Sequence, residues 1–127
     1  MRFEDAQILY NGGRHAAAYY MAGYAVECAL KACIAKRTRE FDFPLPPNEN
    51  KTAYSHGLND LLKLLKLDVD MREVPETLNL WRFVEEWKVE SRYDLSIGML
   101  RAKQMLDAVG GAPNASNGVL VWLRSRW

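Results

Sequence analysis

The stretch that decides the fold is Arg14–Arg37, which reads RHAAAYYMAGYAVECALKACIAKR. Between Ala16 and Ala35 its only formal charges are Glu27 and Lys31, set among small and apolar residues. A helix that is apolar almost all round belongs either in the centre of a bundle or in a membrane. Two internal charges and many small side chains make insertion into a bilayer unfavourable. We therefore predict that this stretch is the central helix of a helical bundle, with no membrane span.

The composition is that of an ordinary globular domain. The chain has 127 residues, of which 49% are hydrophobic and 26% charged, and its formal net charge is +1. This length can bury a core without disulfides or metals, so we predict one domain over residues 1–127. Because basic and acidic residues nearly balance, we expect no large electrostatic footprint for nucleic acid, which leaves a local basic patch open.

The cysteines and the amino terminus favour a cytoplasmic protein. Cys28 and Cys33 are five positions apart in the central helix, on different faces, which excludes a mutual disulfide and a CxxC metal site. We interpret them as reduced, buried thiols. Residues 1–13 contain acidic residues and no uninterrupted apolar core, so they do not resemble a signal peptide.

In the first half of the chain, glycine and proline mark the ends of the helices. We predict helices over Phe3–Tyr10 and Arg14–Arg37, separated by the glycine-containing stop Asn11–Gly13. Gly23 lies in mid-helix, where it costs about 1 kcal/mol relative to alanine. Its presence indicates that a neighbouring helix approaches closely. The proline-rich segment 40–54 is predicted to be a long loop.

The next two helices are predicted from their capping residues and apolar spacing. Ser55 is a favoured N-cap residue for a third helix, and Pro75 suits the first turn of a fourth. We predict that Asp68–Glu73, between them, is a polar connection. The predicted buried faces are Leu58, Leu61, Leu62 and Leu65 in the third helix and Leu80, Trp81, Val84 and Trp87 in the fourth.

The last third of the chain predicts a fifth helix and a short terminal one. Ser91 and Asp94 are spaced like a capping box, and Gly110–Gly111 would end the fifth helix. Gly118–Trp127 fits a strand or a helix by periodicity, and the lack of a partner strand favours a short helix. The fold class is therefore all-α, an antiparallel up-and-down bundle of about five helices. The fifth helix is expected to bury Leu95, Met99, Ala102, Met105, Leu106 and Val109.

Glu27 and Lys31 form an i, i+4 pair in the most apolar helix of the chain. Burying charges is expensive unless they are paired. Two interpretations stay open. The pair is structural, tying the helix to Arg92 or to the region of His56, or it belongs to a site. In a site, Lys31 would face a phosphate or Glu27 would orient a cation.

Further candidates stand at two predicted helix starts. Arg92, with Tyr93 and Asp94, is placed to contact a phosphate or Glu27 in a bidentate manner. His56 is either a capping residue or a member of the site. The spacing of Tyr19, Tyr20 and Tyr24 fits core packing or stacking on a base. We predict no catalytic residues, no metal ligands and no cofactor; the candidate ligand-binding residues are Glu27, Lys31, His56, Arg92, Tyr93 and Asp94.

Three blocks of sequence resemble consecutive blocks of the HEPN superfamily. They are residues 12–37, which contain GYAVECALKA, residues 54–65 (YSHGLNDLLKLL) and residues 81–94 (WRFVEEWKVESRYD). The resemblance spans roughly Phe3 to Val109 and is strongest to small prokaryotic members. It implies an α-helical bundle, often a homodimer, that acts beside a minimal nucleotidyltransferase in toxin–antitoxin or related defence systems.

Three alternative functions are open, of which the resemblance implies the first two. Many HEPN proteins are similar to metal-independent ribonucleases that use an arginine followed four to six residues later by a histidine, at a dimer cleft. Here Arg92 is followed by YDLSIGMLRA, and no histidine occurs downstream. We therefore expect a module that binds a nucleotide, RNA or a partner, rather than a ribonuclease. The third alternative is a structural dimerisation module, suggested by Trp81, Trp87, Trp122 and Trp127.

Overall fold

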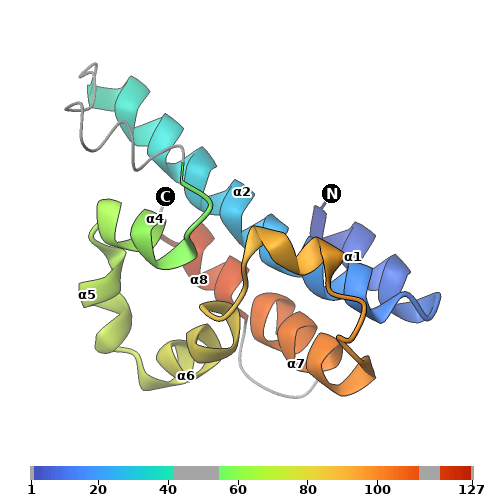
Figure 1. Ribbon diagram of the computed structural model, residues 1–127. Coiled ribbons are helices and arrows are strands. Elements are labelled where there is room, and N and C mark those ends of the chain that lie inside the picture. Colours follow the sequence, from blue (N-terminus) through green and yellow to red (C-terminus); the bar gives the residue numbers. More distant parts are fainter. Residues whose placement is uncertain (1, 42–54, 112–117, 127) are drawn as a thin grey trace.

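The computed structural model describes residues 2–41, 55–111 and 118–126. Over these residues every regular element is helical, and five of the α-helices have seven residues or more. This confirms the predicted all-α bundle. The elements are α1 (Arg2–Asn11), α2 (His15–Phe41), α4 (Leu58–Leu64), α5 (Leu67–Arg72), α6 (Pro75–Val84), the 3-10 helix η1 (Val89–Tyr93), α7 (Met99–Gly110) and α8 (Val119–Arg124) (Figure 1).

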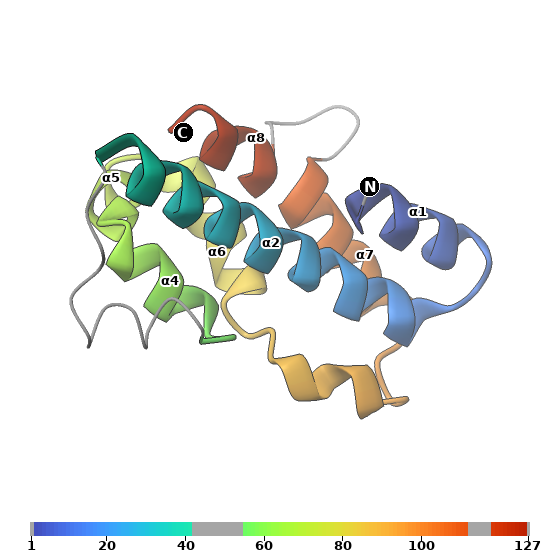
Figure 2. The same cartoon turned by 90° about the horizontal axis from the view of Figure 1, so that it is seen from above.

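Helix α2 crosses the whole molecule, and the other elements are arranged along it (Figures 1 and 2). A tight turn folds α1 back beside it, with Gly13 at φ 81° and the Arg14 amide donating to the Leu9 carbonyl at 2.8 Å. α2 ends at Phe41, four residues beyond the predicted Arg37. Basic residues near a helix end stabilise its carbonyls without terminating the helix. Of the predicted loop, residues 42–54 lie outside the described part of the chain.

Helices α2 and α4 run in the same direction (Figure 2). Two contacts fix this arrangement. Glu27 meets His56 just before α4, and Arg37 Nη1 donates to the carbonyl of Leu65, the C-cap residue of that helix, at 2.7 Å. Both ends of α4 are therefore tied to α2. As a result, the segment that leads into α4 lies beside the middle of α2 rather than beside its end.

Two predictions between residues 55 and 73 are wrong. The N-cap of α4 is Gly57, not Ser55. Ser55 lies two residues before it, and its hydroxyl accepts a hydrogen bond from the Gly57 amide at 2.9 Å. The predicted polar connection is helix α5, which begins after Lys66 takes a left-handed conformation with φ 60°. The charged residues of α5 face outwards, and only Leu67 and Met71 are buried. Two buried side chains are too few to give a helical period that can be recognised in the sequence.

The predicted start of the fifth helix is also wrong. Ser91 and Asp94 do not form a capping box, because η1 includes Ser91 and ends at Tyr93, while α7 starts only at Met99. The Asp94 carboxylate instead accepts the Ser96 amide at 3.0 Å, a local turn that competes with helix formation. Leu95 and Met99, which were expected in the core, are 87% and 60% exposed.

Other boundaries are confirmed. Pro75 opens α6, as its missing amide hydrogen allows. Gly111, with φ 92°, terminates α7, and the terminal segment forms the short helix α8. A close approach is present at Gly23, but a side chain makes it and not a neighbouring helix. A Cβ there would overlap the indole of Trp87, which lies between α6 and η1 and whose Nε1 donates to the Tyr20 carbonyl at 3.1 Å. In the described residues, no helix has both the length and the hydropathy needed to cross a membrane.

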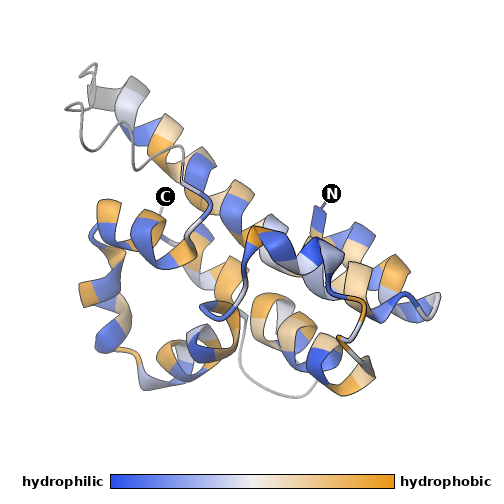
Figure 3. Cartoon of the chain, in the orientation of Figure 1, coloured by the Kyte–Doolittle hydropathy of each residue, from blue (hydrophilic) through white to orange (hydrophobic). Residues whose placement is uncertain are grey.

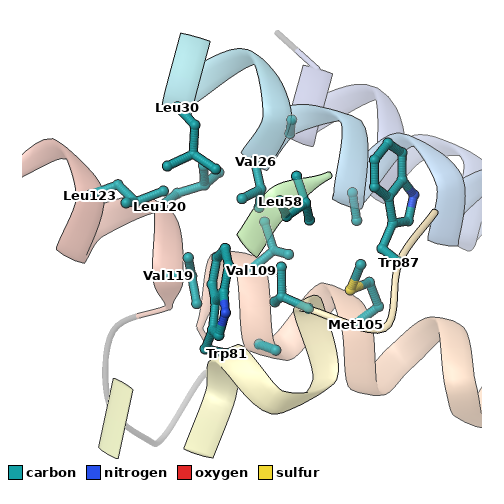
Figure 4. Close-up of a cluster of buried hydrophobic side chains, with 14 of the residues drawn as sticks. Val26, Leu30, Leu58, Trp81, Trp87, Met105, Val109, Val119, Leu120 and Leu123 are labelled. Carbon is teal, nitrogen blue, oxygen red and sulfur yellow. The ribbon is translucent and has the colours of Figure 1, made fainter. Parts of the chain in front are cut away.

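The core lies between α2 and the shorter α-helices, which all contribute buried hydrophobic residues to it. Figure 3 shows hydrophobic and hydrophilic residues alternating along these helices. The predicted leucine stripe of the third helix is buried, as are Trp81, Val84 and Trp87, whereas Leu80 is half-buried. The buried Trp81 indole donates to Asn59 at 2.8 Å. Figure 4 shows how side chains from five segments interleave, among them Val26, Leu30, Leu58, Trp81, Val109, Leu120 and Leu123.

Candidate functional site

The most unusual side chain in the described structure is Glu27, a carboxylate that is only 2% exposed on the apolar helix α2. It has two partners. Oε1 accepts a hydrogen bond from Nδ1 of His56 at 2.9 Å, and Oε2 lies 3.5 Å from Nζ of Lys31. Each carboxylate oxygen is thus engaged by a different nitrogen, which offsets the desolvation of the buried charge. The pair predicted from sequence is in place, and its long-range partner is His56.

Glu27 also determines how His56 is presented. An ionised carboxylate only accepts hydrogen bonds, so Nδ1 of His56 carries the hydrogen in this contact and Nε2 is left for another partner. The His56 side chain is 55% exposed, whereas that of Glu27 is 3% exposed. The buried carboxylate therefore holds an imidazole whose second nitrogen is available to a ligand.

The local backbone explains why His56 reaches α2. The Ser55 hydroxyl accepts the Gly57 amide, which forms a tight turn immediately before α4. Gly57 is extended (φ −73°, ψ 115°), and a Cβ at this position would crowd the Asp60 carboxylate and the Ser55 hydroxyl. The turn and α4 itself fix the position of His56. Lys31 lies beside Glu27 without any such turn, because residues four apart on a helix are neighbours.

The second group of candidates, Arg92, Tyr93 and Asp94, lies at the end of η1. The Arg92 guanidinium lies over the Tyr93 ring at 4.7 Å from its centroid. The Asp94 carboxylate accepts hydrogen bonds from the hydroxyl and the backbone amide of Ser96. These hydrogen bonds lower the pKa of the Asp94 carboxyl group. In the described structure no ion pair or hydrogen bond joins this group to Glu27; His56 takes the position proposed for Arg92.

The two groups nevertheless share one side of the molecule. η1 packs against α2, and Figures 1 and 2 show η1, the short gold helix, and the start of α4 on the same side of α2. The structure thus brings Glu27, Lys31 and His56 into direct contact and leaves Arg92, Tyr93 and Asp94 on a neighbouring element. In the described residues, no group of three histidine, cysteine or acidic side chains could hold a metal ion.

Sequence reasoning missed Arg2. Its guanidinium lies over the ring of Tyr24, 5.3 Å from the ring centroid. Tyr24 is on α2, about one helical turn before Glu27. The neighbouring Cys28 thiol, followed by burial, raises the pKa of the Tyr24 phenol, with Glu27 adding to the effect. The only sequence signal for Arg2 is the Asn11–Gly13 stop, since a tight turn after a short helix returns its first residues to the middle of α2.

In a comparison with protein families, residues 1–109 match the HEPN domain. This range contains every candidate residue described above and all elements from α1 to the body of α7. The chain belongs to the HEPN family.

HEPN membership supports a nucleotide- or RNA-related module in general. No curated protein and no solved structure matches the chain. Helix α8 lies beyond the matched residues, yet its Val119, Leu120 and Leu123 belong to the same hydrophobic core as the HEPN helices.

Proposed function

We propose that this HEPN protein binds the phosphate of a nucleotide or of RNA at Glu27, Lys31 and His56. The observation that carries the proposal is the nearly complete burial of Glu27 beside two nitrogen-bearing side chains that are themselves partly exposed. A stability role alone does not need such a contact, because apolar residues fill a helical core at least as well. A carboxylate that orients a histidine and a lysine is useful where an anion has to be held.

The chemistry of the two partners fits a phosphate. Lys31 offers three donors on a flexible stem, and its side chain is 32% exposed. His56, when protonated, offers Nε2–H as a second charged donor. The element η1, which contains Arg92, lies on the same side of α2 as the start of α4 (Figure 2), so Arg92 would supply a further cation to a longer ligand. This is the local basic patch left open by the neutral composition.

The test is binding of a fluorescent adenine nucleotide and a labelled short RNA, measured by anisotropy at low salt. Lys31→Ala and His56→Ala should each weaken binding at least tenfold. Lys103→Ala is the matched control, because Lys103 also pairs with an acid four residues away, Asp107 at 3.6 Å, but on the exposed face of α7. Failure of the wild type to bind either probe, or equal affinities for all variants, would refute the proposal.

As for its biological setting, we propose a cytoplasmic component of a toxin–antitoxin or related defence system, partnered by a minimal nucleotidyltransferase. The support is the resemblance of residues 12–37, 54–65 and 81–94 to small prokaryotic HEPN proteins of such systems. The gene beside this one should encode a nucleotidyltransferase, and the two products should co-purify. Growth arrest on expression of this chain, relieved by the partner, would support the toxin role; the absence of both effects would count against it.

We further propose that the chain forms a homodimer through residues 93–100, from the end of η1 to the start of α7. Two of the four tryptophans do not contribute to this surface, because Trp81 and Trp87 are buried; Trp122 is half-buried, and Trp127 lies outside the described residues. Instead, four large side chains within eight residues are mostly exposed there: Tyr93, Leu95, Met99 and Leu100. Contiguous exposed apolar residues mark interaction surfaces. Arg92 and Asp94 lie beside them, so a second copy related by two-fold symmetry offers the opposite charge to each.

A further inference from the structure

An aromatic row lies on α2 next to the Glu27 site. Tyr20, Tyr24, Glu27 and Lys31 are spaced by four, three and four residues, which places them along one face of the helix. Figure 2 shows α2 flanked by α1 on one side and by η1 and the start of α4 on the other. Each flank contributes side chains to this face: Arg2 comes from α1, and His56 precedes α4.

The rings of this row form a continuous stack. Tyr20 and Tyr24 are nearly parallel, at 15°, with centroids 6.0 Å apart. On its other side Tyr20 meets the Trp87 indole at 5.7 Å and 32°. Trp87 is itself fixed by packing on Gly23 and by its hydrogen bond to the Tyr20 carbonyl. The stack therefore leads from the buried Trp87 to the exposed side chain of Arg2.

The structure separates these tyrosines from the core tyrosine beside them. Tyr19 is 2% exposed and belongs to the hydrophobic core, and burial raises the pKa of its phenol. Tyr20 and Tyr24 are only partly buried. Core packing therefore takes up nearly all of the surface of Tyr19 but only part of that of Tyr20 and Tyr24. At the outer end of the row, the exposed guanidinium of Arg2 lies over the ring of Tyr24.

We propose that Tyr24 is a stacking platform for the unpaired base of a nucleotide, whose phosphate is held by Lys31 and His56. This inference rests on the phosphate site proposed above and adds the recognition of the base. Tyr24 and Lys31 are seven residues apart, a rise of about 10 Å along the helix. Base and phosphate thus meet separate side chains on one face. The ligand class is a nucleotide with an unpaired base, either free or within single-stranded RNA.

Arg2 suits this arrangement. An exposed cation–π contact is weaker than the stacking of a base on an aromatic ring. A base therefore replaces the Arg2 guanidinium on Tyr24, which frees that cation to approach the phosphate. Stacking on a tyrosine does not select among bases, because every base presents a π-face. The platform should accordingly show little base preference.

The experiment compares three probes, AMP, a uridine hexanucleotide and inorganic phosphate, by calorimetric titration. Tyr24→Leu should weaken binding of AMP and of the RNA at least tenfold while changing phosphate binding less than twofold. Tyr24→Phe should retain affinity, because the ring and not the hydroxyl stacks. Lys31→Ala should weaken all three. Tyr10→Leu is the matched control, since Tyr10 is also partly buried and contacts another ring, that of His15, at 5.4 Å.

A second measurement does not depend on how well the variants fold. In the wild type, AMP should shift the Tyr24 ring protons upfield in NMR spectra, and phosphate alone should not. Binding of AMP supports a free nucleotide as the ligand, and binding of the RNA alone supports a nucleotide within a single strand. If Lys31→Ala weakens AMP and RNA binding while Tyr24→Leu leaves both unchanged, the platform is refuted and the phosphate site stands. If no probe binds, both proposals fail.

Discussion

Glu27 and His56 are 29 residues apart in the chain, yet Nδ1 of His56 lies 2.9 Å from Oε1 of Glu27. The contact joins the middle of the central helix α2 to the turn that precedes α4. It also satisfies one oxygen of a carboxylate that is almost completely buried, the other being met by Lys31. One side chain thus links the packing of two helices to the candidate binding site.

The Glu27–His56 contact should be measurable as a coupling energy. His56→Ala should lower the free energy of unfolding by about 1–3 kcal/mol, because it leaves a buried carboxylate short of a partner. In a Glu27→Leu background the same substitution should cost less than about 0.5 kcal/mol, since nothing then needs His56. Urea denaturation of the four proteins gives both values. Equal costs in the two backgrounds would mean that the contact does not stabilise the fold.

Gly23→Ala should be strongly destabilising. A Cβ at this position would overlap the indole of Trp87, which is buried and hydrogen-bonded to the Tyr20 carbonyl. We expect a loss of about 1–3 kcal/mol in unfolding free energy, the usual effect of overpacking. Gly12→Ala is the control, because a Cβ there meets only ordinary contacts, 3.4 Å from the Ile8 carbonyl, and should change stability by under about 0.5 kcal/mol.

The two thiols should react at very different rates. Cys33 is 2% exposed, and burial raises the pKa of its thiol, so at pH 8 it holds less of the reactive thiolate. Cys28 is half-buried and reachable from solvent. With an aromatic disulfide reagent, the native protein should release one equivalent of thiolate quickly and the second only in denaturant. Cys28→Ser should abolish the fast phase; a fast phase that survives would contradict the burial of Cys33.

The proposed dimer should dissociate when its apolar surface is charged. Leu95 and Leu100 are 87% and 71% exposed, so the double variant Leu95→Glu, Leu100→Glu should fold normally as a monomer. Sedimentation velocity at micromolar concentration compares it with the wild type. Val69→Glu, at a site on α5 that is 55% exposed, is the control and should leave the dimer intact. A monomeric wild type would refute the dimer.

In the ribonuclease alternative, His56 and Arg92 would have to come together from separate segments of the chain and cleave RNA without a metal ion. We expect no cleavage, for two reasons. No histidine follows Arg92 at the spacing found in the ribonucleases that the family resembles, and His56 is hydrogen-bonded to Glu27 of α2. Incubation of the purified protein with labelled RNA in the presence of EDTA decides the matter. Cleavage that is lost in both His56→Ala and Arg92→Ala would overturn this expectation and make the site catalytic.

Local signals predicted most of the helices but not all of their ends. The leucine spacing after Gly57, Pro75 and the Gly110–Gly111 pair each act within a turn or two, and the structure follows them. The prediction failed where a turn competes with a helix. The Asp94–Ser96 hydrogen bonds delay α7 and expose Leu95, while in α5 two buried residues were too few to give a readable period.

What the sequence determined by itself is the all-α fold, the central helix and the neighbouring positions of Glu27 and Lys31, because helix periodicity fixes residues four apart without help from the rest of the chain. The tertiary structure decided that His56 rather than Arg92 meets Glu27. It also decided that Tyr19 enters the core while Tyr20 and Tyr24 form a partly exposed stack. Such contacts depend on how helices pack and cross, and packing geometry is set by side chains from many segments at once.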